Sequence, residues 1–218
     1  MWGGSAQESQ GIFPDEPSWY QTRYGYRPTE GETLSLAIGQ GANSQTPLKM
    51  AQFYVALARD GSAPAPAIAR SARVQDGWQL NLAEDHLAAL REGLRRVTAF
   101  GGTAHYGTAL EHWDVLGKTG TGQNELSVQG LAEDHAWFAG MAGPPGEPPE
   151  IVVVAIVEYG QSGSAMAAPI VAKAADFYLR RKYGMEVSSV QTYLDHIAVG
   201  PVPTWYNERF PQAPGDNR

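Results

Sequence analysis

The sequence predicts an α+β fold in which helices flank an antiparallel sheet. Two apolar segments, HAWFAGMA at 135–142 and EIVVVAIVEY at 150–159, are joined by the loop GPPGEPP. Short apolar runs on either side of a proline- and glycine-rich loop are typical of a β-hairpin. Three other segments, at 46–61, 81–97 and 164–184, carry the apolar periodicity or the terminal residues of helices.

The first third of the chain combines an irregular segment with a helix. Residues 1–33 are rich in glycine, proline, serine and aromatic residues without a sustained period, so we expect loop with short strands or turns. The first helix is expected within 46–61. Thr46 suits its N-cap, Pro47 its first helical position and Gly61 its C-terminal cap.

The remaining elements follow in order. A second helix is expected at about 81–97, where Asn81 can cap the start and Arg95 and Arg96 fill the last turn. Residues 115–122 should form a strand after a glycine-rich loop. The apolar run IVVVAIV predicts a central strand covered on both faces, and the third helix is apolar enough to lie on that sheet.

Composition narrows the classes of function. The 218 residues carry a net charge of −7, which argues against a nucleic-acid groove. Cysteine is absent, so disulfides, thiolate chemistry and cysteine metal sites are excluded. The longest aliphatic run, Ile151–Val157, is far shorter than a membrane span, and residues 1–10 have no basic or apolar region of a signal peptide. We therefore expect no membrane contact by this chain.

The segment VLGKTGTGQN combines two possible motifs. Gly-Lys-Thr ends a phosphate-binding loop, but such a loop needs a glycine five residues before the Gly-Lys pair, where this chain has His112. Glu111 beside it would repel phosphate. Lys-Thr-Gly, in contrast, occurs in penicillin-recognising enzymes, where it binds carboxylates.

Lys118, Thr119, Gly120 and Thr121 are therefore the candidate binding residues. Lysine supplies a charge and the two threonines supply hydroxyl donors, while glycine lets a ligand backbone lie close to the strand. A ligand that pairs with the strand edge would add a strand to the sheet, and the Thr121 N–H could serve as one oxyanion donor. Taken alone, the Lys-Thr-Gly tripeptide favours the simpler interpretation of a strand end that carries an ordinary surface lysine.

Five segments that occur in a fixed order favour the binding motif over an ordinary strand end. They are SLAIGQGANSQTPLKMAQFYVALARDG at 35–61, LREGLRRVTAFGGTAHYGTA at 90–109, LGKTGTGQ at 116–123, HAWFAGMAG at 135–143, and a strand and helix ending at Tyr183. Together they resemble the C-terminal part of the transpeptidase domain of class B penicillin-binding proteins, especially the cell-elongation type.

The resemblance implies a partial penicillin-binding transpeptidase fold over 1–183, followed by a tail at 184–218. It implies the activity of a peptidoglycan D,D-transpeptidase, with Lys118, Thr119, Gly120 and Thr121 holding the substrate carboxylate. The implied ligands are peptidoglycan stem peptides and β-lactams, and the implied partners are other cell-wall synthesis proteins. No metal or organic cofactor is implied. The implied location is the periplasmic or cell-wall-facing side of the cytoplasmic membrane.

One departure from the family pattern concerns the nucleophile. The family uses Ser-x-x-Lys, Ser-x-Asn and Lys-Thr-Gly, and only the third is present. The nearest imitation, TPLK at 46–49, is interpreted as a helix cap. We therefore expect no catalytic residue in this chain and an upstream nucleophile. The chain could be a truncated product, one half of a split enzyme, or a non-catalytic module that binds a peptide or a partner.

Two other patterns are weaker. GQSGS at 160–164 approximates a nucleophile elbow, but serine occupies the last glycine position, so a strand-to-helix turn is favoured. The five histidines show no His-x-x-x-His or His-Glu-x-x-His spacing, so no metal site is expected.

Overall fold

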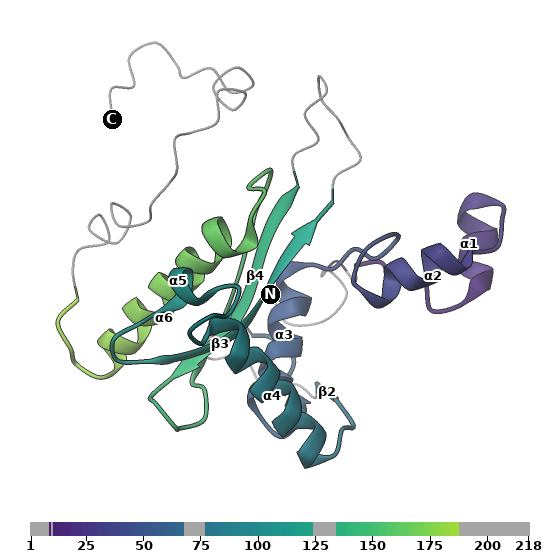
Figure 1. The fold of residues 1–218 in the computed structure, drawn as a ribbon. Coiled ribbons are helices and arrows are strands. Elements are labelled where there is room, and N and C mark those ends of the chain that lie inside the picture. The colour runs from purple at the N-terminus through teal and green to yellow at the C-terminus, as the bar shows by residue number, and fades with distance from the viewer. Residues whose placement is uncertain (1–8, 10, 68–76, 124–133, 188–218) are drawn as a thin grey trace, which may run out of the picture.

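The computed structural model describes residues 9, 11–67, 77–123 and 134–187. Its centre is an antiparallel sheet of β3 (Asp114–Gly122), β4 (His135–Gly143) and β5 (Ile151–Val157), as Figure 1 shows. The other elements are α1 (Pro17–Tyr24), α2 (Glu30–Ala37), α3 (Pro47–Ala58), β1 (Ser62–Ala63), β2 (Trp78–Gln79), α4 (Glu84–Thr98), α5 (His105–Thr108), the π-helical turn η1 (Gly163–Ala167) and α6 (Ala168–Lys182). The predicted α+β class is confirmed.

The strand order corrects one expectation. The hairpin of β4 and β5 is antiparallel as predicted, with Met141 opposite Val152. However, β4 rather than β5 is the central strand, because β3 pairs with the other edge of β4. Helices α3 and α6 both contact β5, so its apolar residues are covered from two sides although the strand lies at an edge of the described sheet.

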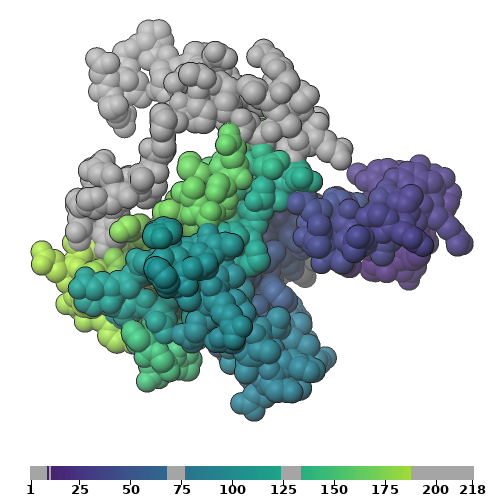
Figure 2. Space-filling view, in the orientation of Figure 1, coloured from purple at the N-terminus to yellow at the C-terminus, as the bar shows by residue number. Residues whose placement is uncertain are grey.

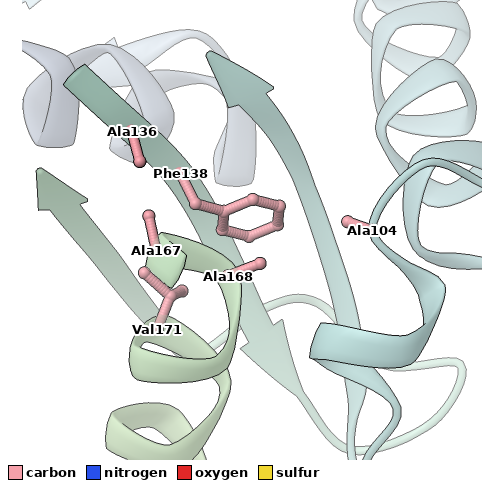
Figure 3. Close-up of a cluster of buried hydrophobic side chains, with 6 residues drawn as sticks. All are labelled: Ala104, Ala136, Phe138, Ala167, Ala168 and Val171. Atoms are coloured by element: carbon pink, nitrogen blue, oxygen red, sulfur yellow. The ribbon is translucent and has the colours of Figure 1, made fainter. Parts of the chain in front are cut away.

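Side-chain alternation along β4 divides the core between the two faces of the sheet. On one face Phe138 packs with the start of α6, including Ala168 and Val171 (Figure 3). On the other face Met141 packs with Leu57 of α3, and Leu87 and Leu116 complete this cluster. Successive side chains of a strand point to opposite faces. The sheet therefore has a packed helical layer on each side.

The signals for α3 give the structure that they predict. The Thr46 hydroxyl accepts a hydrogen bond from the Lys49 N–H at 3.1 Å, and Pro47 occupies the first helical position. Gly61 adopts a left-handed conformation after the helix, and its N–H donates to Ala56 O at 3.1 Å. Thr46 is thus a helix cap, as the sequence indicated for TPLK.

The expectation of loop over 1–33 is wrong in its described part, which contains α1 and the start of α2. Pro17 begins α1, and Gly25 ends it in a left-handed conformation. Thr29 and Glu32 form a reciprocal capping box at the start of α2. These two short helices form an arm that projects from the rest of the molecule (Figures 1 and 2). The Thr-x-x-Glu pattern at 29–32 is the sequence signal that would have predicted α2.

The expected tail at 184–218 lies almost entirely outside the described residues, which end at 187. Among the described residues, no helix combines the length and the apolar character needed to cross a bilayer.

The capping box of α2 leads to a prediction on pH. The Thr29 N–H and the Tyr26 hydroxyl donate to the Glu32 carboxylate at 2.8 and 2.7 Å, and these bonds lower the pKa of Glu32 from its ordinary value of 4.5. A lowered pKa stabilises the fold fully above the ordinary pKa, and this contribution disappears as the pH falls through the lowered value.

We therefore expect the protection factor of the Thr29 amide, measured by hydrogen exchange, to fall as the medium is acidified below about pH 4. Glu32→Gln keeps an acceptor that does not titrate, so its protection should show no such step. A wild-type protection factor that stays constant across this acidification would contradict the assignment.

Candidate functional site

The four candidate residues lie in the second half of β3. Lys118, Thr119, Gly120 and Thr121 stand opposite residues 139 to 136 of β4, in that order. Lys118 and Thr121 are exposed, whereas Thr119 and Gly120 are half-buried. In the described part of the chain β3 pairs with β4 alone, so its other side is an open sheet edge. The tetrapeptide therefore lies on an edge strand, which pairs with the central strand β4 on one side only.

Alternation separates the side chains of the site. Thr119 stands opposite Phe138, so the two threonines share the face that α6 covers. Lys118 leaves the strand from the opposite face, which also carries Met141 and Leu116. Its ammonium nevertheless reaches the open edge, where Nζ donates to Thr119 O at 2.9 Å and lies 3.4 Å from the Thr119 hydroxyl. A cation and a hydroxyl thus meet at the edge.

Hydrogen bonds from side chains reveal which backbone groups of β3 face this edge. Three carbonyl oxygens of β3 accept such bonds: Thr121 O from Gln40 Nε2 at 2.9 Å, Thr119 O from Lys118 Nζ, and Val115 O from the Thr98 hydroxyl. In an antiparallel strand, the N–H and C=O of one residue point to the same side. The N–H groups of Thr119 and Thr121 therefore also face the open edge.

Close packing requires glycine at position 117 of this strand and leaves little room for a side chain at position 120. A Cβ on Gly117 would lie 2.5 Å from the Phe138 ring, so a side chain there would displace the core. A Cβ on Gly120 would lie 3.1 Å from Trp137 Cβ. The first turn of η1 approaches equally closely, since a Cβ on Gly163 would lie 2.7 Å from Gly120 O. The backbone of the site is therefore supported by β4 and by η1.

Some sequence candidates lie elsewhere. The segment at 160–164 leads from β5 into η1, where the Ser162 hydroxyl accepts from the Ala165 N–H at 3.2 Å and so caps the turn. His135 Nδ1 accepts from the Tyr159 N–H at 3.0 Å. No cluster of three or more potential metal ligands occurs within the described residues. Gln40 contacts the site and was not predicted from the sequence, although it lies within the segment at 35–61 that carries part of the family resemblance.

A helix-flanked antiparallel sheet with a Lys-Thr-Gly strand at its edge is the arrangement of penicillin-recognising proteins. Residues 3–176 match the family described as the penicillin binding protein transpeptidase domain. The chain belongs to this family, which confirms the resemblance drawn from the sequence.

Curated relatives agree with this assignment. The chain is 31% identical over 188 residues to the peptidoglycan D,D-transpeptidase MrdA of Haemophilus influenzae, covering 75% of this chain and 28% of the relative. It is 31% identical over 192 residues to MrdA of Acinetobacter baumannii, covering 79% of this chain and 28% of the relative. The chain is thus homologous to peptidoglycan D,D-transpeptidases and spans 28% of the length of these two relatives.

Solved structures give the same fold. The crystal structure of Pseudomonas aeruginosa PBP2 in complex with WCK 5153 matches with a TM-score of 0.63 and 28% identity, over 83% of this chain and 41% of that one. The PBP2–MreC complex from Helicobacter pylori matches with a TM-score of 0.63 and 28% identity, over 79% and 32%. A structure that describes the coordination of polymerization and crosslinking by a peptidoglycan synthase complex matches with a TM-score of 0.66 and 30% identity. The match covers 84% of this chain and 30% of that one.

Proposed function

We propose that this chain is the C-terminal portion of a peptidoglycan D,D-transpeptidase and that its Lys-Thr-Gly strand holds the terminal carboxylate of the substrate. The observation that carries the proposal is the open edge of β3, where the Lys118 ammonium lies 3.4 Å from the Thr119 hydroxyl. A carboxylate bound between a cation and a hydroxyl accepts charge-assisted hydrogen bonds, which are stronger than neutral ones.

The backbone of β3 supports the same ligand. An extended peptide can pair with an open strand edge through main-chain hydrogen bonds. The Thr119 and Thr121 N–H groups face that edge because their carbonyls accept from Lys118 and Gln40. A stem peptide that ends in D-Ala-D-Ala would thus lie along β3, with its carboxylate near Lys118 and its penultimate carbonyl near the Thr121 N–H.

The reaction that we assign to the whole enzyme is acyl transfer. A serine attacks the carbonyl carbon of the penultimate D-Ala, the terminal D-Ala leaves, and an amine of a second stem peptide releases the ester. The Thr121 N–H would donate to the oxyanion that forms in each step. This sequence contains no Ser-x-x-Lys motif, so we place the nucleophile and its base in residues outside it.

We extend the proposal to location and partners. Structures of relatives include a complex with MreC and a peptidoglycan synthase complex. We propose that the whole protein works on the cell-wall-facing side of the cytoplasmic membrane, together with other cell-wall synthesis proteins, and that β-lactams occupy the same carboxylate site.

Binding to the chain itself tests the site without needing the nucleophile. The probe is acetyl-Lys-D-Ala-D-Ala, compared with the same peptide carrying a C-terminal amide. Loss of a charged hydrogen bond weakens binding by roughly 1.5–3 kcal/mol, so the amide should bind about 10- to 100-fold more weakly. Shifts of the backbone amide signals over 118–121, followed by NMR, report the affinity.

Lys182→Ala is the matched control for this titration, because Lys182 pairs with Glu150 at 2.8 Å near the other end of the sheet. This variant should bind the acid as the wild type does. Equal affinity for acid and amide would refute the carboxylate site. A chain that binds the acid normally but never becomes acylated, even with an added serine-bearing segment, would favour the non-catalytic binding module.

A further inference from the structure

The turn after α2 is built to direct one side chain toward β3. Gly39 and Gly41 both adopt left-handed conformations, with φ of 80° and 73°, and they flank Gln40. The Gln40 N–H donates to Ser35 O at 2.8 Å, and the Gly39 N–H donates to Leu36 O at 3.0 Å, so the turn is tied to the end of α2. Left-handed conformations favour glycine, which explains why the sequence Gly-Gln-Gly occurs at this place.

The side chain of Gln40 ends at the proposed substrate strand. Its Nε2 donates to Thr121 O at 2.9 Å, across 81 residues of sequence. Gln40 is half-buried, whereas Thr121 is exposed, so the bond lies at the surface of the molecule. This contact connects the arm of α1 and α2 to the last part of β3, and neither the family motif nor the proposed function accounts for it.

Thr121 is the position of β3 that most needs such a restraint. Gly120 precedes it and Gly122 follows it, and glycine restricts the backbone less than any other residue. The N–H and C=O of Thr121 face the same side of the strand. The two groups belong to successive peptide units that are joined by φ and ψ of Thr121. A donor that holds the carbonyl oxygen thus restricts rotation at Thr121, and through it the direction of the N–H that we assign to the oxyanion.

We propose that Gln40 is a positioning residue that holds the backbone at Thr121 in the orientation required for substrate. This inference rests on the proposed function, because it assigns Gln40 a role through Thr121 and not through the ligand. The Gly-Gln-Gly turn places the donor, the hydrogen bond fixes the strand end, and the fixed N–H meets the penultimate carbonyl of the stem peptide.

The test combines affinity with a local readout. Gln40→Leu removes the donor and Gln40→Glu keeps the shape but sets a carboxylate against the Thr121 carbonyl. Each variant is titrated with acetyl-Lys-D-Ala-D-Ala, and a neutral hydrogen bond predicts about a 2- to 10-fold loss of affinity. Amide exchange at Gly122, whose N–H belongs to the same peptide unit as Thr121 O, should accelerate in both variants while exchange at Leu116 stays as in the wild type. Gln45→Leu, in the same segment but bonded to Asn43 at 2.8 Å, should change neither value.

The outcomes separate the two proposals. If the wild type does not bind the peptide at β3, the proposed function fails and the role of Gln40 fails with it. If the wild type binds and both Gln40 variants bind equally well, only the positioning role is overturned. An equal loss of affinity in Gln45→Leu would assign the effect to the segment as a whole and would also overturn it. Weaker binding with faster Gly122 exchange in the Gln40 variants alone supports the inference.

Discussion

Lys118→Ala is expected to lower the second-order rate of acylation by a chromogenic β-lactam about 10- to 100-fold, when the chain is joined to residues that supply the nucleophilic serine. The β-lactam carries a carboxylate in place of the substrate terminus, and the variant removes the cation that would bind it. Lys118→Arg should have a milder effect because a planar fork replaces a point charge. Thr119→Val should also slow acylation, since it removes a hydroxyl and keeps the shape.

Lys182→Ala serves again as the control, because it removes the same charge from the last turn of α6. Its acylation rate should stay within about twofold of the wild type. If Lys182→Ala were as slow as Lys118→Ala, the effect would come from net charge and not from the edge of β3. An unchanged rate in Lys118→Ala would show that the strand does not bind the carboxylate.

Phe138→Ala is expected to cost about 3–5 kcal/mol of the free energy of unfolding. The Phe138 side chain is 0% exposed and lies at the centre of the cluster in Figure 3. Its ring fills the space above Gly117 and Gly140, where an added Cβ would approach it within 3 Å. Alanine would leave that space empty, because neighbouring glycines have no side chains to move into it.

Phe100→Ala gives the matched comparison, since the Phe100 side chain is 87% exposed. Its cost should stay within about 0.5 kcal/mol. Urea denaturation followed by tryptophan fluorescence measures both variants. Similar unfolding midpoints for Phe138→Ala and the wild type would mean that the sheet and α6 do not form a common core.

Local signals account for the parts of the fold that the sequence predicted. Thr46, Pro47 and Gly61 mark α3 through bonds between near neighbours in the chain, so the sequence suffices to find them. The sequence also predicts an apolar stripe of Leu48, Ala51, Val55 and Ala58 on this helix. That prediction is wrong in part, because Leu48 is exposed while Gln52 is buried. Which face of a helix is buried depends on the elements around it, and periodicity alone does not specify them.

The strand order and the Gln40 contact could not be predicted from the sequence, because both depend on the tertiary structure. The apolar run of β5 suggested a central strand, yet within the described residues β5 pairs with β4 alone, and its apolar character agrees with its contacts to α3 and α6. The Lys-Thr-Gly strand was predicted from its residues, but its position at an open edge follows from the pairing of β3 with β4. The bond from Gln40 to Thr121 joins residues that no local pattern connects.

The open edge of β3 also bears on self-association. An exposed strand edge can template the pairing of other chains, and lysine on such an edge is a common protection. If two copies of β3 paired in antiparallel register about Lys118, two ammonium groups would face each other and repel. A neutral segment would offer that cation no counter-charge, whereas a chain end with a carboxylate would. If Lys118 binds the carboxylate as proposed, the same side chain would both recognise the substrate and disfavour pairing with other strands, which would protect this edge from aggregation.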